Sequence, residues 1–191
     1  SAPAGTPEPR ERRADAARLM AELMSGRHPI GAPFALRDPD GRRVTLADFR
    51  GKLVLLYFGY ATCPDVCPTD LAQVGLAVRG LGAADAQVQP VFVTLDPLRD
   101  TPAVLREYAT VFHPRFVSLT GTEDEVRRVA TDYKVFFEKV PLPGGGYAID
   151  HTAYTFLLDR EGKFVILFPP GTEADRMGEM LREQLAATAG R

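Results

Sequence analysis

One continuous apolar run, followed by a helical segment and a second mainly apolar stretch, constrains the fold of this 191-residue chain most strongly. Leu53–Phe58 is a continuous apolar run bounded by Gly51 and Gly59, which predicts a strand buried on both faces. Val88–Leu95 is expected to be the next buried strand. Between them, Thr69–Leu81 carries apolar residues at helical spacing. The pattern predicts a strand–helix–strand unit with a right-handed crossover and two parallel strands.

The rest of the chain continues as alternating helices and strands. We expect a hairpin of Phe34–Arg37 and Arg43–Leu46, a helix from Thr101 to Phe112, a strand at Phe116–Leu119, a helix from the capping box of Thr122 and Glu125 to Asp132, a strand at Lys134–Val140, a loop at Pro141–Asp150, a hairpin of Tyr154–Leu158 and Lys163–Phe168, and a helix from Thr172 to Ala187. This order predicts an α/β fold, a thioredoxin-like three-layer sandwich with a central mixed β-sheet and an N-terminal extension.

Composition points to one ordinary globular domain, with 45% hydrophobic and 25% charged residues. We expect residues 1–28 to form a tail, Ser1–Arg10, followed by a short amphipathic helix within Glu11–Met24. Residues 29–191 then form the folded domain. The net charge of −2 gives no electrostatic case for nucleic acid. No apolar run reaches the roughly 18 residues of a membrane span.

The two cysteines of the chain, Cys63 and Cys67, lie in Cys-Pro-Asp-Val-Cys-Pro just after the first buried strand. Sites in open parallel sheets form at the carboxyl ends of strands, and Asp96 ends the neighbouring strand. Because proline cannot lie in a helix interior, we expect the helix to begin at Pro68, with Cys67 as its N-cap. Both sulfurs then face the positive helix end, which favours thiolates.

A low-pKa dithiol serves metal binding and disulfide exchange alike. Two thiolates with the imidazole of His151 form a soft ligand set that suits Cu(I) better than catalytic zinc or a hard cation. A structural disulfide is an alternative, although so short a ring removes little unfolded-state entropy. A structural zinc site needs four ligands, and the other nitrogen donors are His28 and His113.

His151 ends a glycine-rich loop, which gives it freedom to approach or leave the dithiol. Asp150 either orients the imidazole or is a solvated turn acid. His113 follows a predicted helix and is expected to cap its C-terminus, where the dipole favours a cation. Asp96 is either a partner of the metal site or the cap of the turn before Pro97.

Five stretches carry a family resemblance. They are Asp48-Phe-Arg-Gly-Lys52, Tyr57-Phe-Gly-Tyr-Ala-Thr-Cys-Pro-Asp-Val-Cys-Pro68, Val93-Thr-Leu-Asp-Pro97 with Arg99-Asp-Thr-Pro102, Leu119-Thr-Gly-Thr122, and Asp150-His-Thr-Ala-Tyr-Thr-Phe-Leu-Leu-Asp159. Together they resemble the SCO/SenC family, thioredoxin-fold copper proteins that assist assembly of the CuA centre of cytochrome c oxidase. Thr62 departs from the many members that have a histidine there, which we expect to tune the site rather than remove it.

The resemblance implies that Cys63, Cys67 and His151 bind one copper ion, as Cu(I) or Cu(II). It implies as partners the CuA domain of cytochrome c oxidase subunit II and a second periplasmic copper chaperone. It also implies a location on the periplasmic side of the bacterial inner membrane, with a membrane anchor upstream of this chain.

Two functions follow. The leading hypothesis is a copper metallochaperone, a binding and transfer protein rather than an enzyme. The alternative is a thiol–disulfide oxidoreductase that uses Cys63 and Cys67 to reduce the CuA-site cysteines or another periplasmic target. Against it, C-x3-C departs from the usual C-x-x-C, and no proline lies between Asp150 and Tyr154, where such reductases commonly present a cis-proline.

Overall fold

The computed structural model describes residues 17–188 except 19, 23, 28 and 63–65. The chain divides into two compact units, Ser1–Ile30 and Gly31–Arg191. In the first unit, residues 17, 18, 20–22 and 24 are helical, within the predicted short helix, whereas the predicted tail lies outside the described residues. The described part of the chain contains no helix with the length and apolar character of a membrane span.

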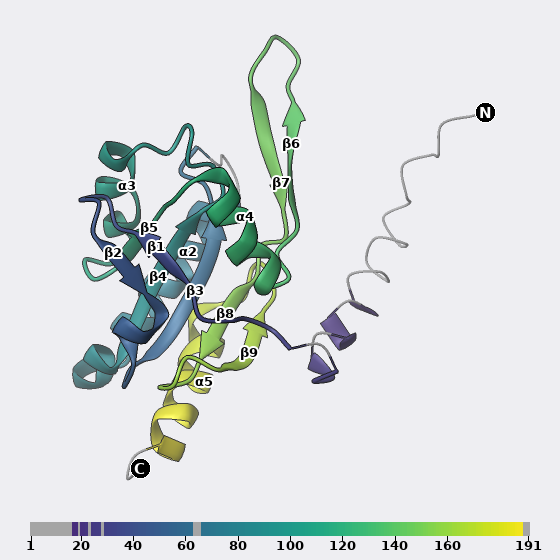
Figure 1. The fold of residues 1–191 in the computed structure, drawn as a ribbon. Helices are drawn as coiled ribbons and strands as arrows, with labels where there is room; N and C mark the ends of the chain where they lie inside the picture. Colours follow the sequence, from purple (N-terminus) through teal and green to yellow (C-terminus); the bar gives the residue numbers. More distant parts are fainter. Residues whose placement is uncertain (1–16, 19, 23, 28, 63–65, 189–191) are drawn as a thin grey trace. The chain divides into compact units, whose positions relative to one another are not determined.

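A five-stranded mixed sheet forms the centre of the Gly31–Arg191 unit (Figure 1). Its order is β5-β4-β3-β8-β9. The strands are β3 (Leu53–Gly59), β4 (Val88–Thr94), β5 (Val117–Leu119), β8 (Thr155–Leu158) and β9 (Phe164–Phe168). β4 is parallel to β3 and β5 to β4, while β8 is antiparallel to β3 and β9 to β8. Every residue of β3 and β4 is buried, which confirms the two doubly buried strands predicted from the sequence.

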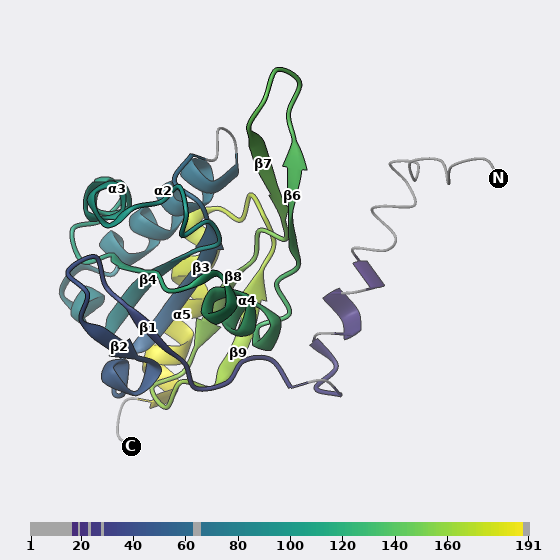
Figure 2. The same ribbon diagram turned by 45° about the horizontal axis from the view of Figure 1, so that its top comes forward.

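Helices cover both faces of this sheet (Figures 1 and 2). They are α2 (Val66–Arg79), α3 (Pro102–Tyr108), α4 (Glu123–Asp132) and α5 (Ala174–Thr188). Leu55 of β3 shares a core with Leu71 of α2 and Leu181 of α5. On the opposite face, Phe58 packs against Tyr133 at the end of α4, with ring centroids 5.7 Å apart. Because side chains alternate between faces along a strand, these contacts form the predicted three layers.

The start of α2 differs from the sequence prediction. The helix begins at Val66, so Pro68 is its third residue and Cys67 is its second residue rather than its N-cap. Proline is tolerated there because the first four N–H groups of a helix have no partner within it. Cys67 therefore keeps its place at the positive end of α2.

The predicted loop Pro141–Asp150 is wrong, because most of it belongs to a second hairpin. β6 (Phe137–Pro141) pairs with β7 (Tyr147–His151) in an antiparallel ladder separate from the central sheet. Gly144, Gly145 and Gly146 all have positive φ and close the turn, a backbone conformation that glycine adopts without steric cost. The hairpin projects beyond the central sheet (Figures 1 and 2), and His151 is the last residue of β7.

The other expected elements are confirmed. The first hairpin consists of β1 (Ala35–Arg37) and β2 (Arg43–Thr45), and 3-10 segments lie at Leu46–Phe49, Gly82–Gln87 and Ala109–Val111. The capping box of Thr122 and Glu125 opens α4, and the Thr101 hydroxyl accepts a hydrogen bond from Val104 N–H at the start of α3.

Gly75 sets how closely α2 packs on the chain that follows α3. A Cβ at this buried glycine would overlap the carbonyl oxygen of Phe112. We expect Gly75→Ala to lower the free energy of unfolding by about 1–3 kcal/mol, as overpacking does, despite the higher helix propensity of alanine. Leu76→Ala, at an exposed position of the same helix, should change it by less than about 0.5 kcal/mol. Urea unfolding measures both, and a neutral or stabilising Gly75→Ala would contradict this packing.

Candidate metal centre

Two of the three predicted ligands, Cys67 and His151, lie in elements that the structure describes. Cys67 lies in the first turn of α2, directly beyond the carboxyl end of β3, whereas Cys63 lies outside the described residues. His151 ends β7. Its ring contacts the ring of Tyr60, which follows β3, at a centroid distance of 5.9 Å and an interplanar angle of 74°. His151 therefore lies beside the chain segment that leads into the cysteine motif.

The imidazole of His151 has an oriented ring. Its Nδ1 lies 3.1 Å from the carbonyl oxygen of Thr152. Since a carbonyl only accepts hydrogen bonds, this contact favours the tautomer with the proton on Nδ1 and the lone pair on Nε2. Asp150, the other expected partner of this ring, is exposed. The contact described at Nδ1 of His151 is with the backbone carbonyl of Thr152 and not with Asp150.

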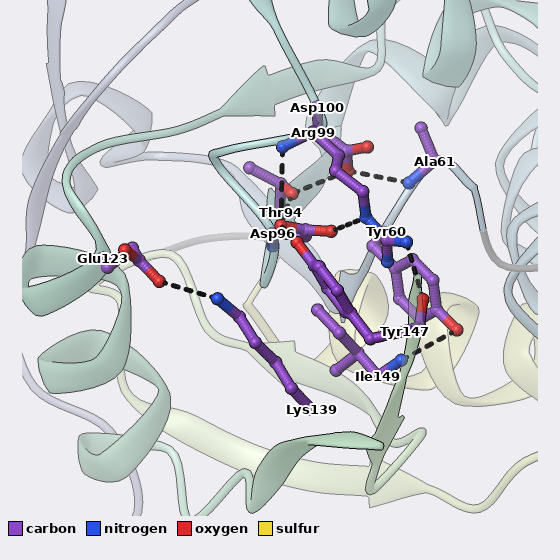
Figure 3. Close-up of polar contacts among 10 residues, drawn as sticks. All are labelled: Tyr60, Ala61, Thr94, Asp96, Arg99, Asp100, Glu123, Lys139, Tyr147 and Ile149. Carbon is purple, nitrogen blue, oxygen red and sulfur yellow. Dashed lines mark hydrogen bonds and ion pairs between the residues drawn. The ribbon is translucent and has the colours of Figure 1, made fainter. Parts of the chain in front are cut away.

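Asp96 is buried in the loop just after β4 and connects to the hairpin that carries His151 (Figure 3). Its Oδ1 accepts a hydrogen bond of 2.9 Å from the hydroxyl of Tyr147, the first residue of β7. Its Oδ2 forms an ion pair with Nε of Arg99. Burial, together with the hydrogen bond to Asp96, raises the pKa of Tyr147, which keeps the phenol protonated as a donor.

Arg99, in the same loop after β4, also contacts β7. Its guanidinium carbon lies 3.7 Å from the ring centroid of Tyr147 and 5.8 Å from that of Tyr60. Its Nη1 donates a 2.6 Å hydrogen bond to the carbonyl oxygen of Tyr147. Tyr60 adds a further link, because its hydroxyl oxygen accepts a 3.2 Å hydrogen bond from the backbone N–H of Ile149 (Figure 3).

Asp100 contacts the segment that leads into the cysteine motif. Its side chain is 1% exposed, and Oδ2 accepts hydrogen bonds of 2.7 Å from the N–H of Ala61 and from the hydroxyl of Thr94. Oδ1 is buried without a hydrogen-bond partner among the described residues. Burial raises the pKa of Asp100. The carboxylate therefore fixes the backbone two residues before Cys63.

Sequence reasoning did not assign roles to Tyr60, Arg99, Asp100 or Tyr147. The first three lie within the stretches that carry the family resemblance, so a signal for them was present in the sequence. Tyr147 lay within the expected loop, where no strand face was assigned to it.

The remaining histidine that the structure describes, His113, has a structural role different from the predicted one. It is 3% exposed, and its Nδ1 accepts a 3.1 Å hydrogen bond from the N–H of Arg115. Burial lowers the pKa of His113, so the neutral ring acts as an acceptor rather than as a cation at a helix end. Among the described residues, which exclude Cys63, no group of three or more His, Cys, Asp or Glu side chains could hold a metal ion.

The fold and this arrangement define a thioredoxin-like protein whose dithiol motif joins a central strand to its crossover helix, with a histidine on a neighbouring hairpin. Residues 23–186 match the SCO1/SenC family, and the chain belongs to that family. A SCO2-like protein of Rickettsia prowazekii is 40% identical over 157 residues, which cover 81% of this chain and 77% of the relative. Mitochondrial SCO1 of Saccharomyces cerevisiae is 43% identical over 143 residues, covering 73% of this chain but 48% of the yeast protein.

Solved structures show the same fold. Copper-bound ScoI of Bradyrhizobium japonicum is 40% identical, with a TM-score of 0.75 over 82% of this chain and 99% of that chain. BsSco, described as having a disulfide switch and as a member of the Sco family of cytochrome c oxidase assembly proteins, is 22% identical. Its TM-score is 0.64 over 82% of this chain and 95% of its own, a likeness of fold.

Titration of Asp100 gives a pH-dependent prediction. A carboxyl whose folded-state pKa is raised stabilises the native state below its unfolded pKa, and this contribution is lost as the pH rises through the folded pKa. We therefore expect the free energy of unfolding of the wild type, relative to Asp100→Asn, to fall as the pH rises above the ordinary value of 3.8. Urea unfolding of both proteins between about pH 3 and 7 measures this difference. A difference that stays constant, or rises with pH, would contradict the direction of the shift.

Proposed function

We propose that this protein is a copper metallochaperone that binds one copper ion through Cys63, Cys67 and His151 and assists maturation of the CuA site of cytochrome c oxidase. Membership of the SCO1/SenC family supports the proposal, as do relatives at 34–40% identity whose structures contain copper. The observation on this chain that carries it is the contact between His151 and Tyr60, which brings the imidazole to the chain entering the cysteine motif.

The chemistry of these donors fits copper. Two thiolates and a neutral imidazole form a soft set suited to Cu(I). The first turn of α2, where Cys67 lies, favours a thiolate because the unpaired N–H groups at a helix start carry partial positive charge. At His151, a proton on Nδ1 directed to the Thr152 carbonyl leaves Nε2 as the metal-binding nitrogen.

Transfer of copper requires that an incoming ligand reach the site. His151 lines an open pocket of about 480 Å³ whose other walls include Arg127, Phe136 and Phe137. A ligand from a partner protein can approach His151 through this pocket and displace it. The partners we propose are the CuA domain of cytochrome c oxidase subunit II and a second periplasmic copper chaperone. The proposed location is the periplasmic side of the bacterial inner membrane, with an anchor upstream.

A thiol–disulfide oxidoreductase is the second candidate function. In that reaction Cys63 and Cys67 would be oxidised to a disulfide while a target disulfide accepts their two electrons and two protons. The position of Cys67 at a helix start favours a reactive thiolate for this chemistry as well. BsSco, with its disulfide switch, shares the fold.

An anaerobic titration with Cu(I) against a competing chelator tests the proposal. We expect one-to-one binding by the reduced protein. Cys63→Ser and His151→Ala should each weaken affinity by more than the roughly 10- to 100-fold that loss of a supporting contact costs, because each removes a metal ligand. His113→Asn is the matched control, since its amide oxygen can still accept the Arg115 N–H, and its affinity should equal that of the wild type.

The two candidate functions separate in the same variants. Binding that is indifferent to His151→Ala would remove His151 from the ligand set and contradict the proposed site. Reduction of a target disulfide that is lost in Cys63→Ser but kept in His151→Ala would support the oxidoreductase instead.

A further inference from the structure

We propose that Arg99 is a positioning residue for His151: it clamps the β6–β7 hairpin onto the loop after β4 and so holds the imidazole toward the cysteine motif. The inference rests on the proposed copper site for its functional consequence. Its structural content, the fixing of the hairpin, stands on the contacts of Arg99 alone.

The hairpin needs support from outside itself. β6 and β7 form a two-stranded ladder that does not join the central sheet, and four of the five residues of β6 are exposed. An isolated two-stranded hairpin is marginally stable at best in water. The position of His151 at the end of β7 therefore depends on the contacts that tie the hairpin to the rest of the domain.

Arg99 supplies the most extensive of the described contacts between β7 and residues outside the hairpin. It stacks on the Tyr147 ring at 3.7 Å and donates to the Tyr147 carbonyl oxygen at 2.6 Å. It also pairs with Asp96, which is 1% exposed and which accepts the Tyr147 hydroxyl as well. By comparison, the ion pair of Lys139 with Glu123 has about half of each side chain exposed, and such surface pairs contribute little.

The loop that presents Arg99 is itself fixed. The neighbouring Asp100 donates its N–H to the carbonyl oxygen of Asp96 at 2.9 Å. Its carboxylate accepts from Thr94 at the end of β4 and from Ala61 before the cysteine motif. Arg99 and Asp100 are consecutive residues of this loop (Figure 3). Arg99 contacts the strand that ends at His151, and Asp100 contacts the segment that leads to Cys63.

The geometry of β7 transmits the clamp to His151. Alternate residues of a strand share a face, so Tyr147, Ile149 and His151 point to the same side of the hairpin. Tyr60 completes this side, since it accepts the Ile149 N–H and contacts the His151 ring. Fixing Tyr147 and Ile149 therefore fixes the face of the hairpin to which His151 points, beside Tyr60.

Arg99 could also affect copper binding through its charge alone, if the guanidinium lowered the pKa values of the cysteine thiols from a distance. Lysine keeps the charge but lacks the planar fork that pairs with Asp96, donates to a carbonyl and stacks on a ring at once. Arg99→Lys therefore separates positioning from charge.

Hydrogen exchange of the apo-protein tests the clamp without copper. We expect Arg99→Gln and Arg99→Lys each to speed amide exchange in residues 147–151 by about tenfold or more, because the hairpin opens more often. Tyr147→Leu, which keeps the Arg99–Asp96 ion pair, should act in the same direction and serves if Arg99→Gln fails to fold. The matched control is Arg106→Gln. Arg106 also uses Nε for an aspartate, Asp40, and a terminal nitrogen for a carbonyl, that of Pro39, but contacts no part of this hairpin in the described structure.

Copper affinity then tests the link to His151. We expect Arg99→Gln and Arg99→Lys to weaken Cu(I) binding about 10- to 100-fold, the usual cost of losing an orienting contact. In a double-mutant cycle, Arg99→Gln with His151→Ala should bind no more weakly than His151→Ala alone.

Three outcomes would overturn the inference: unchanged exchange in both Arg99 variants, wild-type affinity in Arg99→Lys, or additive losses in the double variant. Failure of the proposed function is distinguishable, since it appears as wild-type affinity in His151→Ala. The exchange data then still decide whether Arg99 fixes the hairpin.

Discussion

The full burial of β3 is the constraint on which the rest of this domain depends. All seven residues of the strand are buried, with β4 parallel on one side and β8 antiparallel on the other. A strand without a wet face must be covered by helices on both sides, which places α2 and α5 on one face and α4 on the other. The chain therefore leaves β3 at one defined edge of the sheet. Tyr60, the cysteine motif and α2 come next in the sequence, so the place where β3 ends determines where each of them begins.

Polar groups gather at the same edge because buried charges must be paired. Asp96 and Asp100 are each 1% exposed, and each carboxylate has one described contact with a segment that leads to a candidate ligand: Asp96 with Tyr147 of β7, and Asp100 with the N–H of Ala61. A buried ion pair is weak evidence for stability, since desolvation offsets much of its attraction. Its value here is geometric: the loop after β4 orders both the approach to Cys63 and the strand that ends at His151.

The sequence predicted those elements whose signal is local. A continuous apolar run identified β3, a mainly apolar stretch identified β4, and the capping box identified α4, because each of these signals is formed by residues close in the chain. The β6–β7 hairpin was missed because three consecutive glycines resemble a flexible loop. Its two strands pair with each other and are held by Arg99, which lies 48 residues before Tyr147. The beginning of α2 was placed two residues late because the exclusion of proline was applied to the first turn, where it does not hold.

The same division applies to the candidate site. Residue types and order indicated Cys63, Cys67 and His151 as ligands, and these remain proposals. The supporting residues Tyr60, Arg99, Asp100 and Tyr147 act through contacts between distant segments, so their roles become visible in the folded chain. The open role of Asp96 also takes shape there, as a buried acceptor for Arg99 and Tyr147.

X-ray absorption spectroscopy of the Cu(I)-loaded protein tests the central claim, a site of two cysteines and one histidine, most directly. The account predicts one copper per chain bound by two sulfur atoms and one imidazole nitrogen, with the nitrogen lost in His151→Ala and one sulfur lost in Cys63→Ser. Copper bound by sulfur alone in the wild type, or a nitrogen ligand that persists in His151→Ala, would contradict it.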